Sequence, residues 1–158
     1  MIFTILFVIF NLINPESLLE QYKQTADKNI LAFLGEGELK VLAKNSGHEY
    51  YIFNSEKSNK GAIVVFSSVK GRIEYFDYMI IVSSSLEIIN IKILKYRSEY
   101  GYEISNKGWL KQFYGKPGIR FEYRKDIDAL SGATFSAPSL VNDINSILDY
   151  LKNKSLVQ

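Results

Sequence analysis

The sequence predicts a single α+β domain built around a largely antiparallel sheet. The chain has 158 residues, about the size of one ordinary domain, and 47% of them are hydrophobic, so one sizeable core can be buried. A helical pattern comes first, a series of short β-rich runs follows, and another helical pattern ends the chain. The connections between the β-rich runs are too short to hold crossover helices, so neighbouring strands should be antiparallel.

The chain begins with an apolar run over residues 1–14, which is shorter than the ~20 residues of a membrane-spanning helix. The run resembles an export signal, although no Lys or Arg precedes it and no small-x-small cleavage site clearly follows. A buried strand or helix at the edge of the domain is the alternative. We therefore expect a signal peptide or membrane anchor at 1–14, a domain over 15–158, and an extracytoplasmic location, either periplasmic or exported.

An amphipathic helix is expected over residues 16–34. Apolar residues recur there at three- and four-residue spacing, and charged residues fall between them. The helix should end near Gly35 and Gly37. Its expected apolar face consists of Leu18, Tyr22, Ala26, Ile30 and Phe33.

Strands should follow, because runs rich in Ile, Val, Phe and Tyr are separated by Gly, Ser, Asn and Lys. The expected strands are 39–44, 50–54, 61–69, 73–82 and 87–96. His48 falls between two of them and is expected in a surface turn. Lys70-Gly71-Arg72 lacks the Gly-rich loop of a nucleotide-binding motif, so we expect a hairpin turn there.

A short helix is expected over 103–113, followed by a brief strand over 119–123 and a last helix over 137–152. Pro138 is compatible with the last helix because it falls in the first turn. The residues expected to be buried on the short helix are Ile104, Trp109, Leu110 and Phe113. Those on the last helix are Leu140, Ile144, Ile147, Leu148 and Leu151.

The composition argues against several functional classes. The net charge is only +2 and the basic residues are scattered, so no nucleic-acid partner is expected. The absence of cysteine excludes disulfides, cysteine-ligated iron–sulfur clusters and thioether-linked haem. A zinc cluster is not expected around the single His48, and no Gly-x-Ser-x-Gly motif accompanies it as in many Ser–His–acid hydrolases.

The segment before the last helix, Asp126-Ile-Asp-Ala-Leu-Ser-Gly-Ala-Thr134, carries the strongest functional signal. Unpaired amides and the helix dipole favour a phosphate there, and Thr134 places a hydroxyl at the centre of such a site. Alternatively, Ser131, Thr134 or Ser136 simply caps the helix. Asp126 and Asp128 precede a turn, where aspartate is ordinarily favoured, so a catalytic acid–base pair is the weaker interpretation.

The segment Asp128-x-x-Ser131-Gly132-Ala133-Thr134 resembles the Asp-x-x-Ser/Thr-Gly-Ala-Thr signature of FMN-binding domains. These domains occur in flavin-carrying subunits of the Rnf and sodium-translocating NADH:quinone oxidoreductase complexes. Upstream, Glu99-Tyr100-Gly101-Tyr102-Glu-Ile104 and the following Trp109-Leu-Lys-Gln-Phe113 resemble a second segment of the family, with Tyr100 in place of the usual threonine. The resemblance covers residues 61–151. Within that range, Phe76-Asp-Tyr-Met-Ile80 and Lys95-Tyr-Arg-Ser98 resemble a small exported branch of the family.

The resemblance implies that FMN is joined through a phosphodiester to Thr134 by an FAD:protein FMN transferase. It implies cofactor contacts from the rest of the signature and from the upstream segment. These expected contacts are Asp128, Ser131, Gly132, Ala133, Glu99, Tyr100, Gly101 and Tyr102.

The function implied is that of an electron carrier with no catalytic side chain, working with a membrane-bound or periplasmic redox partner. A non-redox binding domain, with Thr134 as a helix cap, is the principal alternative. A flavin-dependent reductase acting on a small substrate is a further one.

Overall fold

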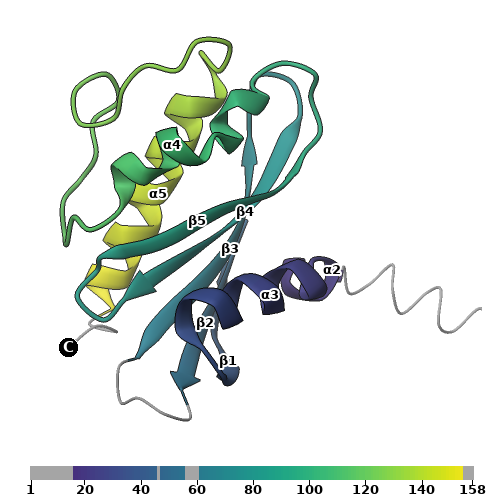
Figure 1. Cartoon of the computed structure of the whole chain (residues 1–158), viewed down its shortest axis with the longest axis vertical. Coiled ribbons are helices and arrows are strands. Elements are labelled where there is room, and N and C mark those ends of the chain that lie inside the picture. Colours follow the sequence, from purple (N-terminus) through teal and green to yellow (C-terminus); the bar gives the residue numbers. More distant parts are fainter. Residues whose placement is uncertain (1–15, 46, 56–60, 155–158) are drawn as a thin grey trace, which may run out of the picture.

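The structure is a computed structural model that describes residues 16–45, 47–55 and 61–154. Its sheet is an antiparallel meander in which each strand pairs with the next along the chain, in the order β1-β2-β3-β4-β5 (Figure 1). The strands are β1 (Gly37–Asn45), β2 (His48–Ser55), β3 (Ala62–Lys70), β4 (Tyr75–Ser83) and β5 (Ile88–Tyr96). The expected α+β architecture is confirmed, while the expected signal segment at 1–14 lies outside the described residues.

Two helices, α2 (Leu18–Gln21) and α3 (Lys23–Leu34), pack on one face of the sheet. Ala26 and Ile30 are buried there, as expected. The single helix expected over 16–34 is divided at Tyr22, whose hydroxyl donates a hydrogen bond to Asp77 on β4 at 2.5 Å. Phe33 was expected on the buried face but is 47% exposed, because it lies beside a pocket at the β5 edge.

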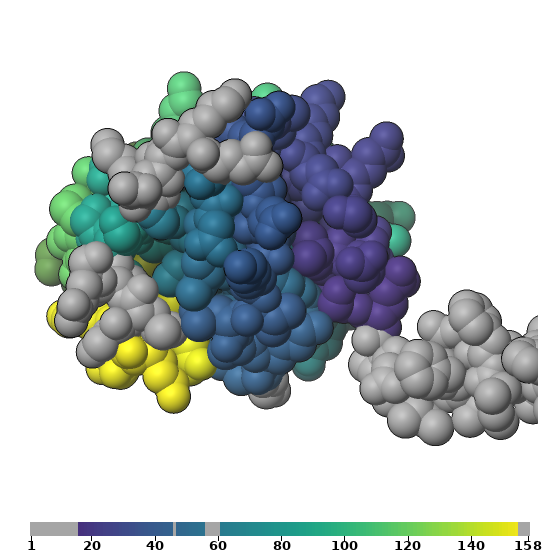
Figure 2. Space-filling model, turned by 90° about the horizontal axis from the view of Figure 1, so that it is seen from below, coloured from purple at the N-terminus to yellow at the C-terminus, as the bar shows by residue number. Residues whose placement is uncertain are grey.

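The opposite face is covered mainly by α5 (Ser136–Asn153), whose expected apolar stripe is buried. Figure 2 shows the blue β1–β2 end of the sheet with purple α2–α3 on one side and the yellow end of α5 on the other. The sheet is therefore enclosed between two helical layers.

The helix expected over 103–113 is three short pieces, η1 (Tyr102–Ser105), α4 (Lys107–Leu110) and η2 (Lys111–Phe113). The break falls at Asn106, whose extended backbone ends η1 and whose side chain accepts a hydrogen bond from the Trp109 amide at 3.0 Å. A capping asparagine competes with helix continuation in this way. The four apolar side chains expected to face the core are nevertheless buried.

The strand expected over 119–123 does not form. Instead, the amide of Phe121 donates to Oδ1 of Asn145 on α5 at 2.9 Å, and the side-chain amide of Asn145 donates to the Phe121 carbonyl at 2.8 Å. A buried asparagine therefore satisfies the backbone groups that a neighbouring strand would otherwise have paired.

His48 was expected in a surface turn, and this prediction is wrong. His48 begins β2, and its half-buried ring places Nε2 2.9 Å from Oδ1 of Asp143 on α5. The hydroxyls of Ser67 and Tyr78 donate to Oδ2 of the same carboxylate, each at 2.7 Å. Asp143 thus joins α5 to three strands of the sheet.

Candidate cofactor site

A small hollow of about 130 Å³ lies at the N-terminus of α5. Its wall comes from the turn between β3 and β4, the segment after β5, and the segment before α5. The lining residues are Arg72, Tyr100, Gly101, Gly132, Ala133, Thr134, Phe135 and Ser136. The fold therefore brings the Gly-Ala-Thr part of the signature next to part of the upstream segment.

The backbone on the α5 side of the hollow depends on glycine. Gly132 has a φ of +85°, and a Cβ atom there would collide with the carboxylate of Glu103. The next residue, Ala133, is buried, and its carbonyl accepts the Ala137 amide at 2.9 Å. This sharp turn leads the chain directly into α5.

The segment after β5 approaches just as closely. Gly101 has a φ of +96°, and a Cβ atom there would collide with the Tyr96 hydroxyl and lie 2.8 Å from Oγ of Ser136. The Tyr96 hydroxyl lies 2.5 Å from Oγ of Ser136 and donates to the Tyr100 carbonyl at 2.8 Å. Tyr96 therefore joins the two halves of the hollow.

The alternative in which a hydroxyl side chain caps the last helix does not match the structure. Phe135 occupies the N-cap position and no side-chain cap hydrogen bond forms, while Ser136 is turned toward Tyr96. Within the described ranges, the amides of Thr134, Phe135 and Ser136 make no backbone hydrogen bond. These donors and the helix dipole favour an anion at this end of α5.

Thr134 lies at the surface of this hollow. The residue is exposed, and its hydroxyl forms no hydrogen bond with any part of the chain that the structure describes. An exposed hydroxyl beside unpaired amides is sterically open to modification and close to donors that would stabilise an attached phosphate.

Arg72 supplies the one charged side chain among the residues that line the hollow. Its guanidinium carbon lies 5.2 Å from the ring centre of Phe135. The hairpin turn expected at 70–72 is present, with the Gly71 amide donating to the Glu74 carbonyl at 2.9 Å. The turn places the Arg72 side chain at the start of α5. The sequence did not reveal this position, because no local pattern connects the two segments.

Several residues of the expected site lie outside the hollow. Asp128 and Ser131 are exposed and do not line it, and neither does exposed Glu99. Tyr102 lines a separate pocket along β5. The main chain of Asp128 is nonetheless fixed, because its carbonyl accepts from Nε1 of Trp109 at 2.9 Å and its amide donates to Oε1 of Gln112 at 2.9 Å.

Exposed aromatic rings line the hollow or follow it closely in the chain. Tyr100 is 72% exposed and Phe135 is 54% exposed, and both line it. Tyr102, which is 64% exposed, follows Gly101 directly. Large exposed rings beside the hollow offer faces on which a flat ring can stack.

The cluster around Asp143 does not have the geometry of a hydrolase triad. Both His48 and Ser67 are bonded to the carboxylate, so the serine hydroxyl is directed at the acid and not at the imidazole. Asp126 likewise has a turn role, since its carboxylate accepts the Glu122 amide at 2.9 Å. In the part of the chain that the structure covers, no group of three His, Cys, Asp or Glu residues is placed to hold a metal.

No protein-family model matches the chain, and no curated protein matches it either. Among the described helices, none combines the length and apolar character needed to cross a membrane. The site must therefore be interpreted from its own geometry and from the resemblance of its signature.

Proposed function

We propose that this protein is an extracytoplasmic electron carrier that holds FMN through a phosphodiester to Thr134. The observation that carries the proposal is the position of Thr134, an exposed hydroxyl at an uncapped helix N-terminus beside Arg72. A phosphodiester carries one negative charge, and both the helix dipole and the guanidinium favour a negative charge there.

The dimensions of the hollow fit the phosphate end of the cofactor. A volume of about 130 Å³ is well below the ~300 Å³ or more of a site that encloses a whole organic ligand. The ring system of the flavin would therefore lie outside the hollow, where Tyr100 and Phe135 offer exposed faces for stacking. When bound, the flavin supplies the electron chemistry, while these side chains affect its orientation and exposure to solvent.

The attachment reaction requires an FAD:protein FMN transferase. A bond forms between Oγ of Thr134 and the FMN phosphorus, the pyrophosphate bond of FAD breaks, AMP leaves, and the hydroxyl proton passes to a base of the transferase. A covalent tether suits an exported carrier, because a dissociable cofactor would be lost by dilution. The expected electron-transfer partner is membrane-bound or periplasmic.

The test is coexpression of the chain with an FMN transferase, followed by intact-mass analysis and a visible spectrum. Wild type should gain the mass of one FMN less water and absorb as a flavin. Thr134→Ala should gain neither, whereas Thr25→Ala should behave as wild type, because Thr25 is an exposed threonine on α3 far from the signature.

A colourless wild type of unmodified mass would overturn the proposal and favour the non-redox binding domain. Flavinylation that persists in Thr134→Ala would place the tether on another residue and would equally contradict it. Reduction of the attached flavin by dithionite and its reoxidation by a soluble acceptor would then establish that the cofactor is redox-active.

A further inference from the structure

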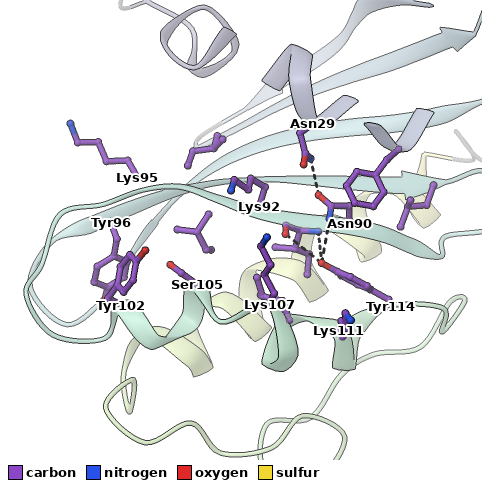
Figure 3. A pocket seen from close by; sticks show the side chains of 16 residues that line it. Asn29, Asn90, Lys92, Lys95, Tyr96, Tyr102, Ser105, Lys107, Lys111 and Tyr114 are labelled. Atoms are coloured by element: carbon purple, nitrogen blue, oxygen red, sulfur yellow. Dashed lines mark hydrogen bonds between the residues drawn. The ribbon is translucent and has the colours of Figure 1, made fainter. Parts of the chain in front are cut away.

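A second pocket, separate from the hollow at Thr134, runs along the β5 edge of the sheet. Its volume is about 640 Å³, within the range of sites that enclose small organic ligands. Figure 3 shows it between β5 above and the η1–α4–η2 segment below, with Asn29 of α3 above β5 and bonded to Asn90.

The charge around this pocket is of one sign. Lys92 and Lys95 on β5 and Lys107 and Lys111 on the facing segment line it, and no Asp or Glu does. None of these lysines forms an ion pair with a carboxylate elsewhere in the described chain. In Figure 3, Lys92 and Lys107 lie over the middle of the pocket, whereas Lys95 points away.

Lysines on an edge strand often serve only to prevent edge-to-edge aggregation. That explanation covers Lys92 and Lys95, but it does not cover Lys107 and Lys111, which come from the segment on the other side of the pocket. Two separate elements, β5 and the η1–α4–η2 segment that follows it in the chain, therefore place lysines on opposite sides of the same pocket.

The pocket also contains a polar group that lacks a partner. Ser105 lines the pocket, and its buried hydroxyl makes no hydrogen bond with any residue that the structure describes. A buried hydroxyl of this kind is destabilising unless a bound molecule supplies the missing hydrogen bond.

The remaining polar groups of the wall are held in place. Oδ1 of Asn90 accepts from Nδ2 of Asn29 at 2.7 Å, and the Tyr114 hydroxyl accepts from the Ile91 amide at 3.1 Å. Apolar residues of β5 also line the pocket, among them Ile89, Ile93 and Leu94. The wall is thus apolar along the strand. Asn90 and Tyr114 lie at one end of it, and Tyr96 and Tyr102 lie at the other.

We propose that this pocket binds a small organic anion that has a flat apolar body and a carboxylate, phosphate or sulfonate group. The anionic group would lie between Lys92 and Lys107, and Ser105 would donate to or accept from a polar atom of the ligand. The apolar body would lie along β5, with Tyr96 and Tyr102 at its end. This site goes beyond the proposed flavin tether and does not depend on it.

The probe for this site is 8-anilinonaphthalene-1-sulfonate, a flat apolar sulfonate whose fluorescence rises when it leaves water. It is titrated into Thr134→Ala protein, which excludes any contribution from attached flavin. We expect saturable binding at one site, weakened about fivefold to tenfold by Lys107→Gln and by Lys92→Gln. Lys40→Gln, an exposed lysine on β1 that does not line the pocket, should leave the affinity unchanged.

Backbone amide NMR shifts supply the second readout. Binding should move the signals of β5 and of residues 102–114, including Ser105, and circular dichroism should show the lysine variants to be folded. Equal affinity in all the variants, absence of saturable binding, or shifts confined to another face would overturn the proposal. Because the protein used carries no flavin, none of these outcomes bears on flavinylation of Thr134.

Discussion

The hydroxyl of Tyr96 lies 2.5 Å from Oγ of Ser136 and so joins the end of β5 to the first turn of α5. The same hydroxyl donates to the Tyr100 carbonyl, which leaves Ser136 as the donor in the first contact. Ser136 is buried, so its hydroxyl depends on this tyrosine for a partner. Tyr96 therefore fixes the relative position of the two segments that form the hollow at Thr134.

Replacing Tyr96 by Phe should lower both stability and flavinylation. The substitution leaves a buried Ser136 hydroxyl unpaired, which should reduce the free energy of unfolding by about 1 to 3 kcal/mol. Urea unfolding measures this loss, and intact mass after coexpression measures the extent of modification. The control is Tyr75→Phe, because Tyr75 is 50% exposed on β4. Equal stability of the two variants would contradict the structural role given to Tyr96.

Gly101→Ala should damage the hollow more than the small volume of the added methyl group suggests. The added Cβ would enter the space of the Tyr96 hydroxyl, and a φ of +96° is unfavourable for alanine. We expect a loss of about 1 to 3 kcal/mol in unfolding free energy and little flavinylation. Gly61→Ala adds the same atom where nothing lies within 4 Å, so it should be nearly neutral. Efficient flavinylation of Gly101→Ala would show that the segment tolerates displacement.

Arg72→Gln should slow flavinylation of Thr134 without unfolding the protein. The arginine is exposed, so its replacement should change thermal stability little. Loss of its charge beside the phosphate should slow modification about fivefold, equivalent to about 1 kcal/mol. Lys70→Gln removes the same charge from the same hairpin but does not line the hollow. Time-resolved intact mass with purified transferase measures the rate of modification of both variants. Equal slowing in Arg72→Gln and Lys70→Gln would show that the effect is a general loss of positive charge and would contradict a specific role for Arg72.

The strands and the last helix could be predicted from the sequence because their signals are local. Runs of Ile, Val, Phe and Tyr specify the meander, and the 3.6-residue period specifies the buried face of α5. The expected strand at 119–123 failed because a distant residue, Asn145, satisfies the Phe121 backbone. The expected helix at 103–113 failed because Asn106 forms a cap within it.

The candidate site was only partly predictable for the same reason. Gly132, Ala133 and Thr134 are neighbours in sequence, and their positions at the start of α5 follow from local pattern. The contributions of Arg72 and Ser136 depend on how the β3–β4 turn and Tyr96 meet that helix. Pairings of this kind are set by tertiary packing, and a single sequence carries no period or motif that reports them.

Asp143→Asn should destabilise the fold strongly, although the residue lies away from the hollow. Its carboxylate accepts hydrogen bonds from Ser67 and Tyr78 and contacts His48. An amide lacks the carboxylate charge that strengthens these contacts, and it can accept at only one of the two positions, so the bonds to Ser67, Tyr78 and His48 cannot all keep their strength; we expect a cost of about 3 kcal/mol. Asp149→Asn is the matched control on the exposed side of α5. Urea unfolding at neutral pH measures both, and a loss below 1 kcal/mol (about the value of one ordinary hydrogen bond) would contradict the role given to Asp143.

Acid should weaken the fold through the same carboxylate. Burial acts to raise the pKa of Asp143, but hydrogen bonds from His48, Ser67 and Tyr78 outweigh it and hold the pKa below its usual value. The unfolded chain, with an ordinary aspartate pKa of about 3.9, therefore takes up this proton first as the pH falls. The stabilisation is fully present above that value and is lost as the pH falls through it toward the lower pKa of the folded state.

The measurement is the free energy of urea unfolding of wild type and Asp143→Asn between pH 7 and pH 3. Wild type should lose stability below about pH 5, with this carboxylate contributing at most about 1.4 kcal/mol per pH unit. The variant cannot take up that proton, so the difference between the two proteins should shrink as the pH falls. Asp77, whose pKa is also held low by Arg97, Tyr22 and Ser68 against the opposing effect of burial, remains in both proteins and cancels in the comparison. Parallel curves would show that Asp143 titrates alike in the folded and unfolded chains, which the three hydrogen-bonded contacts argue against.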